Sequence, residues 1–173
     1  LEEKEMLPDA VVVAEPTCEE RFGDAIKVGR RGSINGYITL KGKQGHAAYP
    51  QKAINPIHNI AKVLQDMAGA NLDEGDEFFS PSQFIITDIR SGMQVTNVTP
   101  NELKMMFNVR NTTKTTQKEV REFVDKHLKG LDYELKLTQG SYPFCTDTDT
   151  KIVKAMDKSI ESVTGIKPKH STA

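Results

Sequence analysis

The sequence has little cysteine, no excess of charge of either sign and no long hydrophobic run, and each absence excludes a class of protein. Cys18 and Cys145 are the only cysteines, and they lie too far apart for a cysteine-type metal site. They are typical of a reducing compartment, which we expect to be the cytoplasm, and a disulfide between them stays open. The net charge is −1, so the basic surface that a general nucleic-acid binder needs is missing. No stretch approaches the ~20 apolar residues of a membrane-spanning helix.

What is present indicates a folded domain. Hydrophobic residues make up 37% of the 173 residues and charged residues 27%, which suits one ordinary domain or one domain with appendages. The chain begins at Leu1 without an initiator methionine. It stops at Ala173, directly after a helix-and-loop pattern. We therefore expect it to be part of a longer protein.

The central part of the chain, roughly residues 33 to 138, switches regularly between strand and helix periodicity. Alternating or β-rich segments predict strands at Ile34–Lys41, Gln83–Ile89, Leu103–Arg110 and Leu131–Leu137. Asn55-Pro56 is typical of a helix start, and Thr116 with Glu119 forms the pattern of a capping box. Behind these starts, apolar stripes at helical spacing comprise Ile57, Ile60, Ala61, Leu64, Met67 and Ala68, and Val120, Phe123, Val124 and Leu128.

The resulting order, β-α-β-β-α-β, predicts an α+β fold of the ferredoxin-like type. Its four-stranded antiparallel sheet would carry two helices on one face, so that both apolar stripes are buried. This fold serves RNA recognition, regulatory ligand binding and dimerisation alike. RNA recognition needs an aromatic-rich third strand on which bases can stack, and this strand contains Phe107 alone. The sequence therefore argues against an RNA-binding module.

The flanking segments do not belong to this block. Val11–Val13 is a short apolar run bounded by turn residues, which predicts a buried, parallel strand with Glu15 at its carboxyl end. A further helix is predicted after Asp149-Thr150. The simplest account is a small domain at residues 31–140 inserted into a larger α/β domain, of which residues 1–30 and 141–173 are parts.

Several residues could carry chemistry, and each also has a plain structural interpretation. Arg30 and Arg31 lie between glycines and could grip a carboxylate, but they fit a solvated strand entrance better. His46 could donate to a substrate oxygen from its loop, or it could be a structural or merely exposed histidine. The plain interpretation of Glu15 is a solvated carboxylate, because zinc needs three or four protein ligands and the sequence shows no convincing set of such ligands. Asn97 fits a turn and Arg110 a surface charge.

Taken together, six segments resemble the desuccinylases of the M20 metallopeptidase family, in the same order along nearly the whole chain. Two stretches are specific to that branch, Gly29-Arg30-Arg31-Gly32-Ser33 and the run from Gly42 to Pro50. The others are Ala14-Glu15-Pro16-Thr17, Asn55-Pro56-Ile57, Asn97-Val98-Thr99-Pro100 and Phe107-Asn108-Val109-Arg110.

The resemblance implies a two-zinc (possibly cobalt) α/β catalytic domain interrupted by a βαββαβ lid through which the enzyme forms a homodimer. Glu15 matches a zinc ligand. Arg30 and Ser33 match residues that bind substrate carboxylates. His46 matches a lid histidine that stabilises the oxyanion in the partner subunit's active site. Tyr49, Asn97 and Arg110 match residues of the substrate pocket, with Asn97 also acting across the dimer.

The activity implied is hydrolysis of N-succinyl-L,L-2,6-diaminopimelate, a small dicarboxylate amide, to succinate and L,L-diaminopimelate, in lysine and diaminopimelate biosynthesis. The family's other zinc ligands and its catalytic glutamate do not occur in this chain, so we expect the chain alone to be inactive. Two alternatives stay open. One is another M20 deacylase or carboxypeptidase, and the other is a stand-alone ferredoxin-like binding or dimerisation module.

Overall fold

A computed structural model describes residues 8–173. The chain divides into two compact units. The first, here called the flanking unit, consists of residues 1–30 and 145–173. The second, the central unit, consists of residues 31–144.

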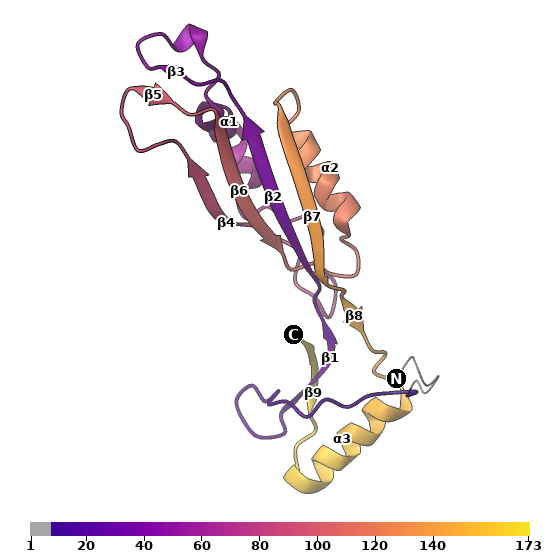
Figure 1. Cartoon of the computed structure of the whole chain (residues 1–173). Coiled ribbons are helices and arrows are strands. Elements are labelled where there is room, and N and C mark those ends of the chain that lie inside the picture. The colour runs from indigo at the N-terminus through magenta and orange to yellow at the C-terminus, as the bar shows by residue number, and fades with distance from the viewer. Residues whose placement is uncertain (1–7) are drawn as a thin grey trace. The chain divides into compact units, whose positions relative to one another are not determined.

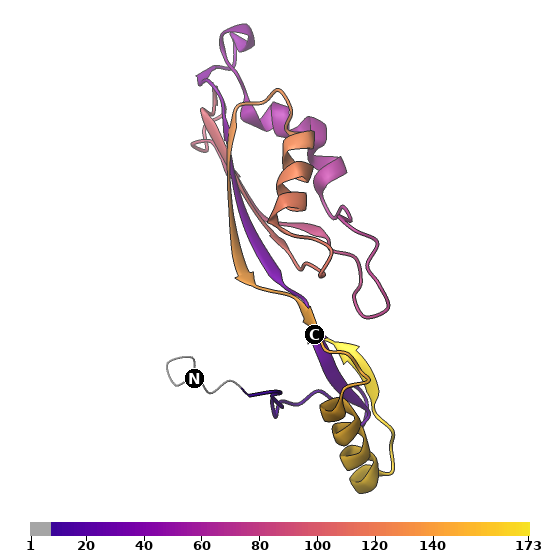
Figure 2. The ribbon, with the colours of Figure 1, turned by 90° about the vertical axis from the view of Figure 1, so that its right-hand side faces the viewer.

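The central unit is a four-stranded antiparallel sheet with two helices on one face (Figures 1 and 2). The strand order across the sheet is β4-β6-β2-β7. Along the chain the order is β2-α1-β4-β6-α2-β7, so the predicted βαββαβ fold is confirmed. The bounds are β2 Ser33–Lys41, α1 Pro56–Met67, β4 Phe84–Ser91, β6 Glu102–Val109, α2 Gln117–His127 and β7 Tyr133–Ser141.

Helix α1 begins as its sequence predicts. Asn55 is the N-cap, its side-chain oxygen accepts a hydrogen bond from the Ile57 amide at 3.0 Å, and Pro56 opens the first turn. The predicted stripe is only partly buried. Ile60 and Met67 lie in the core, whereas Ile57, Ala61 and Ala68 are exposed. The helix therefore contacts the sheet through a narrower face than its apolar stripe, and apolar surface remains on its outer side.

Helix α2 matches its prediction closely. Thr116 and Glu119 form the expected capping box. The Thr116 hydroxyl accepts from the Lys118 amide, and the Glu119 carboxylate accepts from the Thr116 amide. Val120, Val124 and Leu128 are fully buried, and Phe123 packs against the same core. Gly130, with φ of +83°, follows the helix end.

The core lies between the helices and the sheet and depends on one close approach. The rings of Phe84 and Phe107 stack with centroids 4.1 Å apart. Gly36 of the neighbouring strand lies directly against the second ring, and a Cβ added there would come within 1.9 Å of it. Glycine at this position is thus what lets the Phe107 ring lie flat across β2.

Replacing Gly36 with alanine is expected to lower the free energy of unfolding by about 2 kcal/mol, because the core cannot absorb a methyl group there without displacing Phe107. Gly140→Ala on β7 is the matched control, since its Cβ would meet atoms no closer than 3.4 Å. Urea denaturation of both variants gives the comparison. Equal stability of the two variants would contradict the packing argument.

The flanking unit contains a small sheet and one helix. Strand β1 (Ala25–Arg30) lies between β8 (Phe144–Cys145) and β9 (Lys169–Thr172), and it pairs with β9 in parallel. Helix α3 (Lys151–Thr164) follows Thr150 as predicted and ends at Gly165 in the left-handed conformation. None of the described helices is long and apolar enough to cross a membrane.

The predicted buried strand at Val11–Val13 is wrong. These residues form no strand, and Val11 and Val13 are 70% and 68% exposed. A parallel strand is buried only when neighbours pair with it and helices cover it. Among the described residues no strand pairs with this segment, so its apolar side chains face solvent.

Candidate functional site

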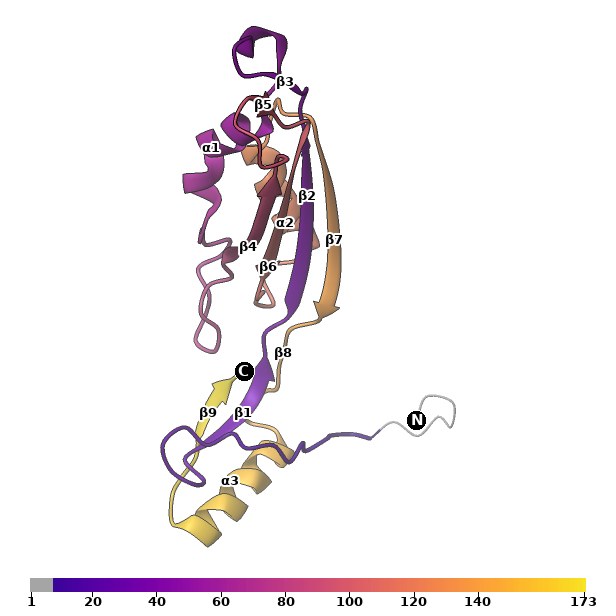
Figure 3. The ribbon, with the colours of Figure 1, turned by 60° about the vertical axis from the view of Figure 1, so that its left-hand side comes forward.

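A short two-stranded ribbon follows the end of β2 (Figure 3). His46 is the last residue of its first strand, and Asn97 directly precedes its second strand. The ribbon pairs β3 (Gly45–His46) with β5 (Val98–Thr99) in antiparallel fashion. The Thr99 hydroxyl accepts from the Gly45 amide at 3.0 Å and donates to the Gly45 carbonyl at 3.1 Å, and the Ala47 amide donates to the Asn97 carbonyl at 2.9 Å. These bonds hold His46 beside Asn97.

The local hydrogen bonds also select the tautomer of His46. The Ala48 amide donates to His46 Nδ1 at 3.1 Å, so that nitrogen carries the lone pair. The proton of the neutral ring is therefore on Nε2, and the exposed imidazole offers an N–H donor. Tyr49 lies next to it, with ring centroids 6.0 Å apart, and the Lys52 ammonium stands 5.1 Å from the Tyr49 ring centroid. Both rings are exposed, as a surface that meets a ligand or a partner requires.

Ser33 and Arg110 lie at the opposite end of the sheet. Ser33 begins β2 and Arg110 directly follows β6, and the two strands pair with Ile34 opposite Val109. Ser33 is buried, and its hydroxyl accepts from Asn108 Nδ2 at 2.9 Å, while the Arg110 side chain is exposed. This end of the central unit thus exposes the cationic side chain of Arg110, while the Ser33 hydroxyl is buried and hydrogen-bonded.

The two groups cannot meet within one central unit. Nine residues of extended β2 separate them, which is about 27 Å at the usual rise per strand residue. The structure therefore brings together His46, Tyr49 and Asn97 at one end and Ser33 with Arg110 at the other.

The remaining predicted site residues belong to the flanking unit. Arg30 is exposed at the end of β1, a strand that the sequence analysis missed, and Glu15 is exposed in the segment before it. No group of three or more His, Cys, Asp or Glu side chains suited to a metal ion occurs among residues 8–173. Glu15 is therefore not part of such a group among the residues that the structure describes.

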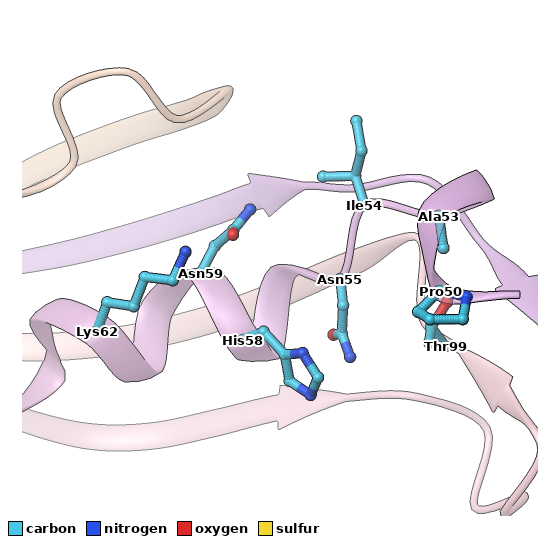
Figure 4. A pocket seen from close by; sticks show the side chains of 8 residues that line it. All are labelled: Pro50, Ala53, Ile54, Asn55, His58, Asn59, Lys62 and Thr99. Atoms are coloured by element: carbon cyan, nitrogen blue, oxygen red, sulfur yellow. The ribbon is translucent and has the colours of Figure 1, made fainter. Parts of the chain in front are cut away.

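Two pockets lie near the ribbon, and neither is lined by a predicted site residue. The first, of about 390 Å³, is formed by Pro50, Ala53, Ile54, Asn55, His58, Asn59, Lys62 and Thr99. Figure 4 shows Asn55 and His58 at the start of α1, with Asn59 and Lys62 further along the helix. The second, of about 310 Å³, lies between Arg90 and Lys104. His46 and Asn97 therefore stand on the outside of this end rather than within a pocket.

Asp73 is the centre of a cluster of polar side chains that the sequence does not predict. Asp73 lies in the loop between α1 and β4 and joins that loop to the one after β6 through several hydrogen bonds. The stretch Leu72-Asp73-Glu74-Gly75 has the composition of an ordinary turn, and nothing in it signals the contacts that Asp73 makes about forty residues further along the chain.

The βαββαβ fold of the central unit is one that dimerisation domains share with several other classes of domain, so the fold alone does not decide among them. The model of the peptidase dimerisation domain matches residues 28–135. The chain belongs to the M20 peptidase family through this domain, as the sequence resemblance predicted.

Curated relatives match over the whole chain. It is 77% identical over 173 residues to succinyl-diaminopimelate desuccinylase of Sulfurimonas denitrificans, covering 47% of that protein. It is 65% identical to the protein of the same name from Aliarcobacter butzleri, again over 47% of its length. The desuccinylase of Wolinella succinogenes is 51% identical over 172 residues. The chain thus spans about half the length of the curated relatives it matches.

Solved structures support the fold alone, because their identities are low. Aminopeptidase PepT of Bacillus cereus aligns with a TM-score of 0.72 at 17% identity, over 87% of this chain and 41% of that one. An M20 family metallo-carboxypeptidase from Sulfolobus solfataricus aligns with a TM-score of 0.68 at 17% identity, over 86% and 53% of the two chains. The architecture of the chain is therefore one that M20 peptidases share.

Proposed function

We propose that this chain is the central part of an amidohydrolase that cleaves N-succinyl-L,L-2,6-diaminopimelate to succinate and L,L-diaminopimelate. Relatives 51–77% identical over essentially the whole chain carry the desuccinylase name. Within that enzyme the central unit, 31–144, is the lid, and the flanking unit belongs to the catalytic domain. The two distant cysteines fit a cytoplasmic enzyme.

The identity to desuccinylases over the whole chain carries the proposal. The separation of the two groups of site residues supports an active site that two subunits share. His46 and Asn97 lie about 27 Å or more from Ser33 and Arg110 along the same sheet. One substrate molecule cannot touch both ends of one lid. An active site that uses all four residues therefore needs two copies of the chain, with His46 and Asn97 supplied by the partner.

Each residue has a chemical task that its position supports. Amide hydrolysis passes through a tetrahedral oxyanion, and a fixed N–H donor aimed at that oxygen lowers the barrier. His46 is fixed as the Nε2–H tautomer and can act as that donor. The substrate is anionic at several carboxylates, and guanidinium groups such as those of Arg30 and Arg110 bind carboxylates bidentately.

We place the dimer contact on the side of the lid formed by β4 and α1. β4 is an edge strand with exposed Ile85 and Ile89, and α1 exposes Ile57. β4 also carries Arg90, paired with Asp88. The opposite edge strand, β7, exposes Glu134 and Lys136 and none of its large apolar side chains, and exposed charges of this kind discourage strand pairing. An isologous contact between two copies of the β4–α1 side would bury these apolar residues.

Membership of the M20 family implies a divalent metal, which we propose to be zinc, at two ions per active site, with cobalt as a substitute. When bound, the metal would polarise the scissile amide and activate water. This chain offers Glu15 as one ligand and, within residues 8–173, no cluster to complete the site. The other ligands must then come from the half of the relatives' length that this chain does not span.

The full-length enzyme is expected to hydrolyse N-succinyl-L,L-diaminopimelate with a kcat/KM at least 100-fold above that for N-acetylornithine, because only the former presents the succinyl carboxylate to an arginine. Release of succinate measures the reaction. A preference for N-acetylornithine or a dipeptide would instead support another M20 deacylase or carboxypeptidase.

The 173-residue chain is the matched control for this assay. It is expected to show no hydrolysis and to hold no two-zinc centre, because it carries one proposed ligand. Zinc binding at a stoichiometry of two, or measurable desuccinylation by the chain alone, would contradict the assignment of the metal centre to the rest of the enzyme.

A further inference from the structure

Asp73 is the centre of a polar network that joins two loops of the central unit. Its Oδ2 accepts hydrogen bonds from the hydroxyls of Ser82 at 2.6 Å, Thr112 at 2.8 Å and Thr115 at 2.6 Å. Its Oδ1 accepts from the amides of Gly75 at 2.8 Å and Ser82 at 3.1 Å. Ser82, Thr112 and Thr115 are all at most 1% exposed. We call these four side chains the Asp73 network.

The carboxylate at its centre is ionised. Burial raises the pKa of Asp73, but the hydrogen bonds from Ser82, Thr115 and Thr112 outweigh that effect and hold the pKa well below its ordinary value. Hydrogen bonds to a charged acceptor are about twice as strong as neutral ones. The network is therefore a strong link between the loop before β4 and the loop after β6.

The second loop carries Arg110. On its N-terminal side, Val109 is held in the sheet between Phe84 and Ile34. On its C-terminal side, the Thr112 amide donates to Ser82 Oγ at 2.8 Å, which ties this loop directly to the Asp73 network. The backbone of Arg110 is thus fixed from both sides while its guanidinium stays exposed.

Asn111 extends the link to the segment of Ser33. Its side-chain amide donates to the backbone carbonyls of Thr115 and Thr112, and its backbone carbonyl accepts from the Gly32 amide at 2.9 Å. A Cβ on Gly32 would come within 2.4 Å of Asn111 Oδ1, so only glycine allows this contact. The Asp73 network therefore holds the Arg110 loop, and through Asn111 the residue before Ser33.

We propose that Asp73 is a positioning residue for substrate binding, which acts by fixing Arg110 against the Gly32–Ser33 segment. The proposal rests on the proposed function insofar as Arg110 binds substrate there. It assigns Asp73 no contact with substrate. Its effect should appear in substrate affinity and should vanish when Arg110 no longer binds.

A double-mutant cycle in the full-length enzyme tests this role. Asp73→Asn keeps the shape and removes the charge, and it is expected to raise KM about 10-fold with kcat within twofold of wild type. In the Arg110→Gln background the same change should leave KM within twofold. Asp76→Asn is the matched control, because Asp76 lies in the same loop and its side chain accepts hydrogen bonds from the nearby amides of Phe78 and Phe79. It should change neither constant.

Two outcomes overturn the proposal. One is that Asp73→Asn raises KM equally in the wild-type and the Arg110→Gln backgrounds. The other is that it lowers only kcat, in proportion to the fraction of folded protein. If Asp73→Asn does not fold, Thr115→Val removes a single hydroxyl from the network and is expected to raise KM about threefold, again only when Arg110 is present.

Amide hydrogen exchange separates this proposal from the proposed function. Asp73→Asn should speed exchange about 10-fold at Gly32 and Thr112, and leave β2 and β6 unchanged, whatever the enzyme hydrolyses. Unchanged exchange at both amides would refute the positioning role even in an active desuccinylase. Faster exchange in a protein without desuccinylase activity would refute the proposed function and leave the structural link standing.

Discussion

Replacement of His46 by alanine is expected to lower kcat of the full-length enzyme by about 100- to 1000-fold, the loss typical when one oxyanion donor is removed. KM should change little, because the donor acts on an oxygen whose charge develops in the transition state. The structure is consistent with a donor role for His46, since the Ala48 amide donates to Nδ1 and leaves Nε2–H free to donate. Steady-state kinetics of succinate release give both constants. His58→Ala, at an exposed histidine of α1, is the matched control and should retain activity.

A hybrid dimer tests whether His46 acts in the partner's site. One subunit carries His46→Ala and the other Glu15→Ala, and the doubly tagged hybrid is purified after co-expression. If His46 acts across the dimer, one site keeps its ligand and receives an intact histidine, so about half of the wild-type activity returns. If His46 served its own subunit, each site would carry one defect and the hybrid would be as inactive as the two parents.

Much of the central unit could be predicted because its local signals agree with its packing. The Asn55-Pro56 start and the Thr116–Glu119 capping box are both formed as the sequence indicates. The alternating residues of β6 and β7 face the core with the expected period. Each signal is satisfied within a few residues, so it needs no knowledge of distant parts of the chain.

The failures share one cause, which is dependence on distant partners. The Val11–Val13 run has the apolar character of a buried strand, but burial requires neighbours that residues 8–173 do not supply. β1 was missed because it is paired with β9, whose first residue, Lys169, is 144 positions away from Ala25. Asp73 was missed for the same reason, since its hydroxyl partners lie up to 42 positions further along the chain.

The candidate site shows the same division. Periodicity alone left Arg30, His46 and Arg110 with plain structural interpretations, and only the resemblance to a family assigned them roles. The structure adds two facts that neither the periodicity nor the resemblance contains. It separates His46 from Ser33 and Arg110 by the length of β2, and it fixes the tautomer through a neighbouring amide.

Arg30→Gln is expected to lower kcat/KM for N-succinyl-L,L-diaminopimelate about 100-fold, because a bidentate guanidinium–carboxylate pair supplies two charge-assisted hydrogen bonds, together about 3 kcal/mol. The loss should fall mainly on KM, since the substrate carboxylate carries the same charge in the ground and transition states. Arg31→Gln is the matched control at the adjacent position, where the half-buried side chain has no proposed substrate contact, and it should change kcat/KM by less than threefold.

The pair of arginine variants also decides between a specific contact and a general attraction. If the arginines attract the anionic substrate only through their positive field, both variants should lose the same amount of kcat/KM. This loss should fade as salt is raised from 0.01 M towards 1 M, because the screening length falls from about 30 to about 3 Å. A bidentate contact depends on one side chain and on its planar geometry, so Arg30→Lys, which keeps the charge, should recover only a small part of the loss. Equal losses for Arg30→Gln and Arg31→Gln, both removed by salt, would show that the Gly29–Ser33 segment attracts the substrate without gripping it.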